Sequence, residues 1–171
     1  MPDLDRITII NNFLPPKLQV EVLEILRKPG WSLGYSPVIE GDNEPPSKLW
    51  HMNDLDRFPL FSEIIFKLIC EKFQTQFKVG RIYANGQLAC QKGQIHRDDG
   101  DLTFLYYPLQ KWHPAWGGNL MFYRGRDVAT CVSYRPNRAV MFPAKYVHGA
   151  EAPSKEYDGL RVSIGWKLLM P

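Results

Sequence analysis

Apolar and polar residues alternate in short runs from about residue 79 to the end of the chain. Gly, Pro and Asp separate these runs and favour turns. A period of two sends successive side chains to opposite faces of a strand. The pattern contains no internal repeat and no low-complexity stretch. It therefore predicts many short strands arranged as a double-stranded β-helix, also called a jelly roll.

Two segments before residue 78 have apolar residues at helical spacing. A first helix is expected to begin at Pro15-Pro16, because proline suits the first helical turn, and to end at Pro29-Gly30. A second helix is expected over residues 60–77. Six apolar residues of this second segment would face a sheet: Phe61, Ile64, Ile65, Leu68, Ile69 and Phe73. Residues 7–10 predict a short strand.

Length and composition favour one globular domain. The 171 residues and the 44% hydrophobic content suffice for a sheet with covering helices and argue against disorder. The predicted fold class is mainly β with flanking helices (α+β), a jelly roll packed against N-terminal helices. We divide this single domain, 1–171, into a helical support region, 1–77, and a jelly-roll core, 78–171.

The cysteines and the N-terminal sequence bear on the cellular compartment. Cys70, Cys90 and Cys131 are an odd number without metal-ligand spacing, so we expect reduced, buried thiols. The first residues lack the charged and apolar segments of a signal peptide, and no apolar run approaches the length of a membrane span. These features favour a cytoplasmic protein.

Charge is unevenly distributed along the chain. Residues 1–77 carry 8 basic and 11 acidic side chains, whereas residues 78–171 carry 13 basic and 7 acidic ones. A positive field over the second part would attract an anionic ligand. We favour the simpler interpretation of a solvated surface. Basic residues are not interleaved with aromatic ones as in a nucleic-acid track.

A metal site is suggested by His96 and Asp98. In an extended segment, residues two apart point to the same face and can bind one ion together. A His-x-Asp pair alone is weak evidence, since one arises by accident in roughly one of five chains of this composition. His148 strengthens it, at the end of an apolar run, 141–147, that predicts a strand. Two imidazoles and one carboxylate are typical of non-haem iron sites with open coordination positions.

An anion site is suggested by the last predicted strand. Alternation over residues 159–166 places Arg161 and Ser163 on one face, with Leu160, Val162 and Ile164 on the other. An inward guanidinium and a nearby hydroxyl suit a carboxylate.

These motifs together resemble the 2-oxoglutarate and iron(II)-dependent dioxygenases, particularly the prolyl-4-hydroxylase-like branch. The resemblance covers roughly residues 79–168, and its motifs occur in the family's order. They are Tyr83-Ala84-Asn85-Gly86-Gln87, His96-x-Asp98, Phe104-Leu105-Tyr106-Tyr107, Trp116-Gly117-Gly118-Asn119-Leu120, residues 136–143, His148 and Arg161-x-Ser163. The interval from His148 to Arg161 is longer than usual for the branch, and we interpret residues 154–158 as an inserted turn.

The resemblance implies roles for particular residues and cofactors. His96, Asp98 and His148 correspond to the Fe(II) ligands, and Arg161 to the residue that pairs with the distal carboxylate of the co-substrate 2-oxoglutarate. Ser163, Tyr107 and Tyr83 correspond to further residues around that co-substrate. Dioxygen is the oxidant, and ascorbate is expected as a supporting reductant.

The implied reaction is hydroxylation of an unactivated C–H bond, with a prolyl residue of a protein or peptide as the expected target. A small-molecule substrate, a nucleic-acid demethylating member of the superfamily and a non-catalytic jelly-roll binding module stay open. Demethylating members carry a second arginine six positions after the first, where this chain has Lys167. This difference makes a nucleic-acid partner the less expected alternative. No membrane partner is expected, because no apolar run approaches the length of a membrane span.

Simpler interpretations compete with several of these assignments. His96 and Asp98 could belong to an exposed turn, Arg161 to an ordinary salt bridge, and the tyrosines to packing. His51 and His113 lack a partner pattern and are interpreted as structural or surface residues. Residues 34–47 and 108–116 predict loops, which we expect at the lip of the substrate pocket. For 108–116 an equal alternative is that its tryptophans pack the loop against the body of the protein.

Overall fold

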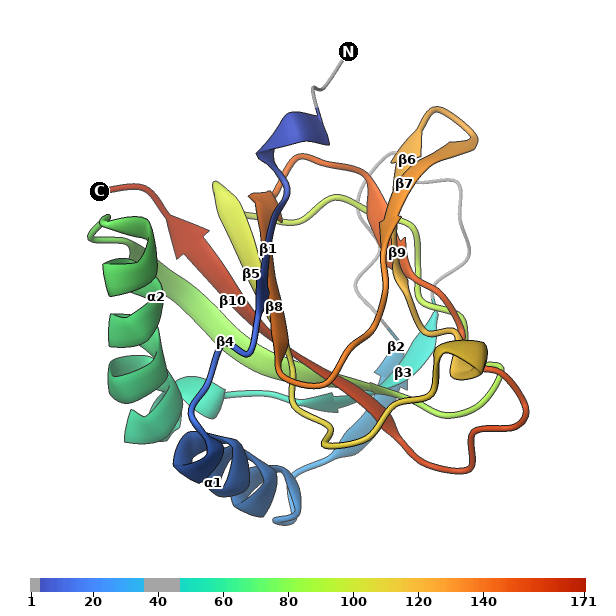
Figure 1. The fold of residues 1–171 in the computed structure, drawn as a ribbon, viewed down its shortest axis with the longest axis horizontal. Coiled ribbons are helices and arrows are strands. Elements are labelled where there is room, and N and C mark those ends of the chain that lie inside the picture. The colour runs from blue at the N-terminus through green and yellow to red at the C-terminus, as the bar shows by residue number, and fades with distance from the viewer. Residues whose placement is uncertain (1–3, 36–46) are drawn as a thin grey trace.

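The computed structural model describes residues 4–35 and 47–171, in which two antiparallel sheets face each other (Figure 1). The larger sheet has the strand order β1-β8-β5-β10-β4-β3-β2, and the smaller one β7-β6-β9. The larger sheet consists of β1 (Thr8–Asn11), β2 (Ser32–Tyr35), β3 (Lys48–Met52), β4 (Lys78–Gln87), β5 (Leu102–Tyr107), β8 (Arg138–Pro143) and β10 (Arg161–Leu169). The smaller sheet consists of β6 (Leu120–Arg124), β7 (Asp127–Val132) and β9 (His148–Ala150). This arrangement confirms the predicted jelly-roll class.

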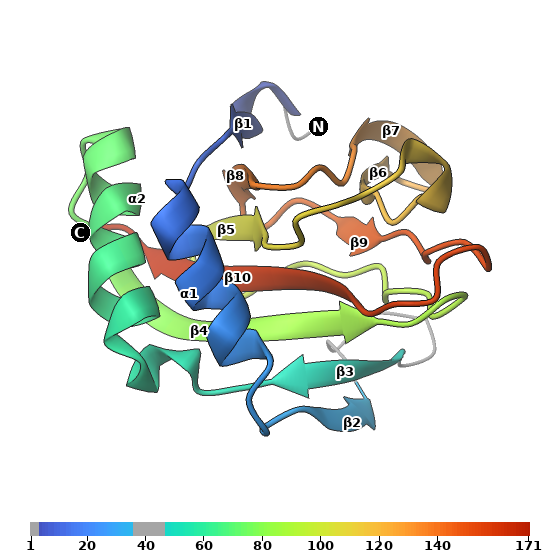
Figure 2. The same ribbon diagram turned by 60° about the horizontal axis from the view of Figure 1, so that its bottom comes forward.

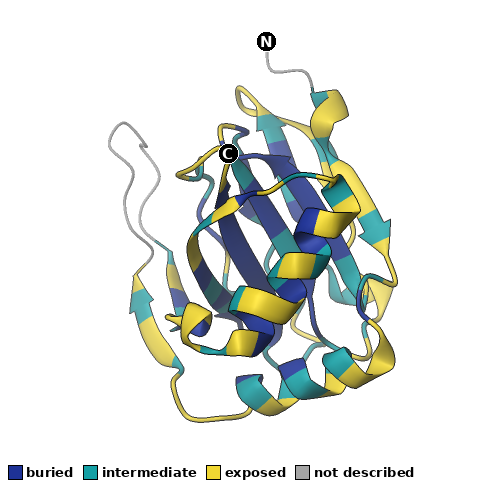
Figure 3. Ribbon diagram, turned by 90° about the vertical axis from the view of Figure 1, so that its left-hand side faces the viewer, coloured by how far each residue is buried: buried dark blue, intermediate teal, exposed yellow. Residues whose placement is uncertain are grey.

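Helices cover the outer face of the larger sheet (Figures 2 and 3). They are α1 (Pro16–Leu26), the π-helical η3 (Leu60–Ile65) and α2 (Phe66–Phe73). The described residues also contain the 3-10 turns η1 (Leu4–Arg6), η2 (Leu55–Arg57) and η4 (Pro114–Trp116). The indole of Trp166 in β10 is fully buried and donates a hydrogen bond of 3.1 Å to the Phe61 carbonyl. The helical layer and the sheet therefore share one apolar core.

The second helix differs from its prediction in register and in length. Its first part is π-helical, with more residues per turn than an α-helix, so the buried face rotates along the sequence. Phe61, Ile65 and Ile69 are buried as predicted, but Ile64 is exposed. The helix ends at Phe73 rather than residue 77, because Gln74 adopts a left-handed conformation with φ of 51°.

The N-terminal part contributes strands as well as helices. The strand predicted at residues 7–10 is β1, which pairs with β8. Strands β2 and β3 were not predicted and extend the larger sheet beyond β4. Most of the predicted loop at 34–47 lies outside the described residues. The division at residue 77 stays a prediction, since sheet strands lie on both sides of it.

Strand β10 runs through the middle of the larger sheet and presents two different faces. Val162, Ile164, Trp166 and Leu168 join the core beneath the helices. Arg161, Ser163 and Lys167 alternate with them and point between the two sheets, where all three are buried. The alternation predicted for this strand is therefore observed, and it places polar groups at the centre of the molecule.

Two further predictions can be compared with the structure. Cys70 is buried, but Cys90 and Cys131 are exposed, so the expectation of three buried thiols is wrong for two of them. All three cysteines are unpaired. Within residues 4–35 and 47–171, no helix combines the length and the apolar character needed to cross a bilayer.

Candidate functional site

Two backbone segments bring His96, Asp98 and His148 together. His96 lies between β4 and β5, and its backbone forms a two-hydrogen-bond bridge with His148 at the start of β9, with N···O distances of 2.8 and 2.9 Å. The Asp98 amide donates to the Ala144 carbonyl at 2.9 Å. One ligand atom from each of the three side chains lies within 4.8 Å of the other two. Distant parts of the sequence thus converge on a space that suits one metal ion.

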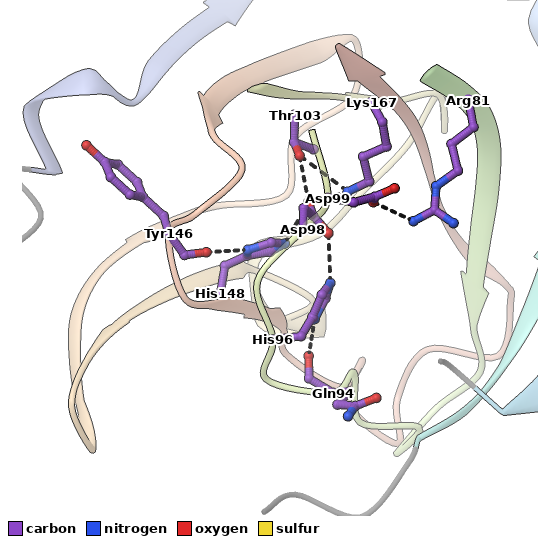
Figure 4. Close-up of polar contacts among 9 residues, drawn as sticks. All are labelled: Arg81, Gln94, His96, Asp98, Asp99, Thr103, Tyr146, His148 and Lys167. Carbon is purple, nitrogen blue, oxygen red and sulfur yellow. Dashed lines mark hydrogen bonds and ion pairs between the residues drawn. The ribbon is translucent and has the colours of Figure 1, made fainter. Parts of the chain in front are cut away.

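Both imidazoles are held in the same way (Figure 4). Each Nδ1 lies 2.9 Å from the backbone carbonyl two residues earlier, that of Gln94 for His96 and that of Tyr146 for His148. Donation of Nδ1–H to a carbonyl leaves Nε2 as the unprotonated nitrogen of a neutral ring. These Nε2 atoms lie 3.1 and 3.4 Å from the two carboxylate oxygens of Asp98. Because lone pairs would then face a carboxylate, the geometry calls for a positive charge between them, from a proton or a metal ion.

Burial and mutual charge shift the pKa values of this group. Burial lowers the pKa of His148 to about 4, so its ring is neutral near pH 7. Burial also opposes protonation of His96, but the hydrogen bond and charge of Asp98 outweigh it and raise the pKa. Burial would raise the pKa of Asp98, yet His148, His96 and Lys167 together hold it well below its usual value. Asp98 is therefore an ionised, buried carboxylate that is ready to bind a cation.

One cavity of about 770 Å³ connects this group with the predicted anion site. Its wall includes His96 and Asp98 together with Arg161, Ser163 and Tyr83. Much of the wall is formed by adjacent strands, because Ser163 of β10 faces Asn85 of β4, which in turn faces His51 of β3. The size is in the range of pockets that hold small molecules.

The Arg161 guanidinium is buried without a carboxylate partner. Its Nε donates to the Gly118 carbonyl at 2.7 Å, and its Nη1 donates to Gln87 Oε1 at 2.8 Å. The rings of Tyr107 and Tyr134 flank it, with centroids 5.7 and 4.9 Å from Cζ. In the part of the chain that the structure describes, no carboxylate lies within 4 Å of it, so the salt-bridge interpretation fails. A buried cation of this kind is stable when an anion joins it.

Tyr107 lies beside Arg161, although it is not one of the residues that line the cavity. Its ring stacks on Tyr134 at 4.4 Å, and it belongs to the core between the sheets. Its hydroxyl is buried and has no hydrogen-bond partner among the described residues. Burial raises its pKa to about 12, although the charge of Arg161 opposes the shift. An unsatisfied hydroxyl next to an uncompensated guanidinium fits a carboxylate that binds both.

Tyr83 and Lys167 complete the opposite end of the site. Gly165 faces Tyr83 across the strands and leaves room for its ring, since a Cβ on Gly165 would lie 3.0 Å from Tyr83 Cζ. Burial raises the pKa of the Tyr83 phenol, against the lowering influence of Lys167. Lys167 forms an ion pair with Asp98. In the sequence, Lys167 stands out only because the demethylating members of the superfamily have an arginine at this position.

Two residues of the cavity wall were not predicted to be functional. His51 Nδ1 lies 2.9 Å from Asn85 Oδ1, and its buried Nε2 has no partner in the described part of the molecule. Gln94 Nε2 is also buried and has no hydrogen-bond partner among the described residues. The sequence gives no partner pattern for His51 and no sign that β3 lies beside β4, so it indicates only a structural or surface role. His113 does agree with that interpretation, since it is exposed and its Nδ1 accepts a hydrogen bond from the Ala115 amide.

The loop at 108–116 packs against the body of the protein. Trp112 contacts Tyr134, Trp116 and Tyr157 with centroid distances of 4.3 to 5.4 Å, and its indole donates to the Gly117 carbonyl. The cavity wall contains no residue of this loop. The structure therefore favours a packing role over a substrate lip. The other predicted lip, 34–47, is mostly outside the described residues, although Tyr35 lines the cavity.

Comparison with known proteins identifies the fold. No protein-family model matches the chain, and no curated protein matches it in sequence. It is similar to an oxidoreductase of the 2OG-Fe(II) oxygenase family from Burkholderia pseudomallei, with a TM-score of 0.72, 10% identity, and coverage of 96% of this chain and 85% of the other.

Two further solved structures that are similar to this chain contain bound ligands. A Trichoplax adhaerens prolyl hydroxylase in complex with a hypoxia inducible factor peptide fragment has a TM-score of 0.67, 19% identity, and coverage of 97% and 84%. HygX from Streptomyces hygroscopicus, with nickel and 2-oxoglutarate bound, has a TM-score of 0.66, 11% identity, and coverage of 96% and 84%. The chain thus has the jelly-roll fold of the 2-oxoglutarate and iron(II)-dependent oxygenases, as its sequence motifs predict.

Proposed function

We propose that this protein is an Fe(II)- and 2-oxoglutarate-dependent dioxygenase that hydroxylates an unactivated C–H bond. His96, Asp98 and His148 would hold the iron. Arg161, Ser163, Tyr107 and Tyr83 would hold the co-substrate. The observation that carries the proposal is the single cavity whose wall includes both the His96–Asp98 group and the buried Arg161 guanidinium. A keto diacid such as 2-oxoglutarate would use both ends of this cavity. One end would hold the metal to which it binds, and the other end would hold its distal carboxylate.

The donor set fits iron(II). Two neutral imidazoles and one carboxylate on one side of an ion leave its other positions open for ligands. When bound, the iron would supply the oxidising chemistry, with 2-oxoglutarate and dioxygen as co-substrates. The carbonyl groups of Gln94 and Tyr146 lie 2.9 Å from the two Nδ1 atoms and would favour the tautomer that leaves Nε2 to the metal. Outer hydrogen bonds of this kind tune metal sites strongly.

The co-substrate pocket owes its selectivity to Arg161. Gln87 and the Gly118 carbonyl hold the guanidinium, which favours a fixed, two-pronged grip on a carboxylate. The Tyr107 hydroxyl and Ser163 would donate further hydrogen bonds. The surrounding rings exclude water and thereby strengthen these charged interactions.

A prolyl residue of a protein or peptide is the substrate that we propose. The sequence resemblance supports this choice, as does the peptide held by the Trichoplax adhaerens neighbour. His51 Nε2 can accept and Gln94 Nε2 can donate a hydrogen bond, which suits the neutral amides of a peptide chain. A small-molecule substrate is the alternative within the same chemistry, because HygX was solved with hygromycin B bound.

Succinate formation tests the proposal. The wild-type protein with Fe(II), 2-oxoglutarate, ascorbate and air should produce succinate, and a proline-containing peptide should increase the rate. His148→Ala should reduce the rate at least about 100-fold, because removal of one of three ligands leaves the ion weakly held. Asp127→Ala, which removes an exposed carboxylate on β7, is the matched control and should behave like the wild type.

Three results would point elsewhere. A folded protein that binds metal and 2-oxoglutarate without turnover would indicate a non-catalytic binding module. Stimulation by a methylated oligonucleotide, but not by peptides, would indicate a demethylating enzyme. Equal succinate formation by the wild type and His148→Ala would refute the assignment of the metal ligands.

A further inference from the structure

Lys167 is a buried cation beside the candidate metal ligands (Figure 4). Its relative exposure is 2%, and its ammonium pairs with Asp98 Oδ2. It also donates to Thr103 Oγ1 at 3.3 Å and lies 5.5 Å from the centroid of the Tyr83 ring. Removal of an ammonium group from water is costly, so a lysine at this depth requires a specific partner. That partner is the carboxylate proposed to bind iron.

The two oxygens of Asp98 consequently have different surroundings. Oδ2 accepts from Thr103 Oγ1 at 2.6 Å and from Lys167, and it lies 3.4 Å from His148 Nε2. In the described part of the chain, Oδ1 has one polar neighbour within ion-pair distance, His96 Nε2 at 3.1 Å. A carboxylate has about four lone-pair positions, so Oδ2 is nearly saturated and Oδ1 is the oxygen left for an ion.

We propose that Lys167 is a positioning residue that keeps Asp98 a one-oxygen metal ligand and, through its own charge, weakens the hold of the site on divalent ions. The inference rests on the proposed function, since it assumes that Asp98 binds a metal. Lys167 and the ion share one carboxylate, so each reduces the attraction that the other feels. The carboxylate is fixed by Thr103 and Lys167 before any ion arrives. Because the second Asp98 oxygen does not bind the ion, one face of the ion stays open for exogenous ligands.

Metal affinity in the absence of 2-oxoglutarate provides the test. Mn(II) binding can be followed by electron paramagnetic resonance, and Co(II) binding by its visible absorption. Lys167→Met and Lys167→Gln should both bind these ions about tenfold more tightly or better than the wild type, because each removes a positive charge next to the ion. Lys78→Met removes an exposed lysine of β4 and should leave the affinity unchanged.

The two variants separate charge from positioning. Gln can still donate a hydrogen bond to Asp98 Oδ2, so the Co(II) spectrum of Lys167→Gln should resemble that of the wild type. Met cannot donate, so Asp98 is free to bind through both oxygens and the spectrum should change. Affinity equal to or below that of the wild type in both variants would overturn the inference. Absence of Mn(II) and Co(II) binding by the wild type would instead refute the proposed function.

A measurement on the wild-type protein covers the case in which both variants fail to fold. A crystal structure with Mn(II) should show Asp98 Oδ1 on the ion and Lys167 Nζ within hydrogen-bond distance of Oδ2. An Asp98 that binds through both oxygens, with Lys167 turned away, would equally overturn the inference.

Discussion

At the scale of single residues, the site is marked by buried polar groups that the protein itself leaves uncompensated. Arg161 has no carboxylate partner within 4 Å, and the Tyr107 hydroxyl has no hydrogen-bond partner, in the ranges that the structure covers. Native proteins satisfy nearly all such groups. The exceptions therefore indicate where a ligand belongs.

Tyr107→Phe should have opposite effects on stability and on binding. Loss of an unpartnered buried hydroxyl should raise the free energy of unfolding of the ligand-free protein by roughly 1 kcal/mol. Loss of a hydrogen bond to a charged carboxylate should weaken 2-oxoglutarate binding roughly tenfold. Denaturant unfolding and calorimetry measure the two effects. Asp127→Ala, at an exposed position on β7, is the control. A loss of stability without a loss of affinity in Tyr107→Phe would contradict the assignment.

Alkaline pH should destabilise the protein partly through Tyr107. Its pKa is raised to about 12 in the folded state, so the unfolded chain, with a tyrosine pKa near 10, releases its proton first. The resulting stability is complete below pH 10 and is lost as the pH rises toward 12, by roughly 2–3 kcal/mol. Unfolding free energies measured between pH 8 and pH 12 should fall less steeply for Tyr107→Phe. Identical slopes would indicate that Tyr107 is not buried.

Residue spacing in the sequence predicts some of these roles but not others. His96 and Asp98 are two positions apart, so their shared face can be predicted locally. The alternation over residues 159–166 predicts Arg161 as an anion-binding residue, whereas Tyr107 could be assigned only through the family resemblance. Lys167 could not be assigned a partner, because its ion pair joins β10 to Asp98 in the segment before β5, far away in the sequence, and depends on the burial of both side chains. Non-local polar contacts of this type leave no periodic signal.

At the scale of elements, the short bridge between residues 96 and 148 holds the proposed metal ligands together. Gly149 permits it, because a Cβ there would lie 3.0 Å from the Gln94 carbonyl oxygen. That same carbonyl accepts the hydrogen bond from His96 Nδ1. The backbone of β9 and the orientation of one imidazole are therefore coupled.

Gly149→Ala should weaken metal binding more than it weakens the fold. The added methyl group must push the segment at Gln94 outward by a few tenths of an ångström, at a cost of about 1–2 kcal/mol of stability. Displacement of the His96 support should reduce Mn(II) affinity roughly tenfold. Electron paramagnetic resonance titration measures this change. Gly34→Ala, whose Cβ would be 4.0 Å from its nearest neighbour in His51, is the control. Unchanged affinity in Gly149→Ala would show that the bridge tolerates movement.

Element predictions succeed where one pattern dominates. The alternation in β10 is regular, so its two faces could be predicted correctly. Strands β2 and β3 are short, β2 is the edge strand, and the sequence near them is rich in turn-forming residues. The π-helical start of the second helix changes the residues per turn, which an α-helical period does not describe.

At the scale of the whole molecule, two rigid sheets bring groups from distant parts of the sequence to one cavity. The order of the motifs along the chain was sufficient to predict this architecture, because the family fold places each motif on a known strand. The sequence does not predict the wall formed by β3, which places His51 in the same cavity as the proposed metal ligands His96 and Asp98. We therefore expect substrate preference to depend on β3, whose place in the sheet the sequence does not predict.

The central claim is that the metal ligands and Arg161 bind one 2-oxoglutarate molecule together. Calorimetric titration of 2-oxoglutarate into the protein, with and without Mn(II), tests it directly. The account predicts one site, with affinity at least about tenfold higher when Mn(II) is present and lost in Arg161→Gln while Mn(II) still binds. Equal affinity with and without the metal would show that the two groups do not share a ligand and would contradict the account.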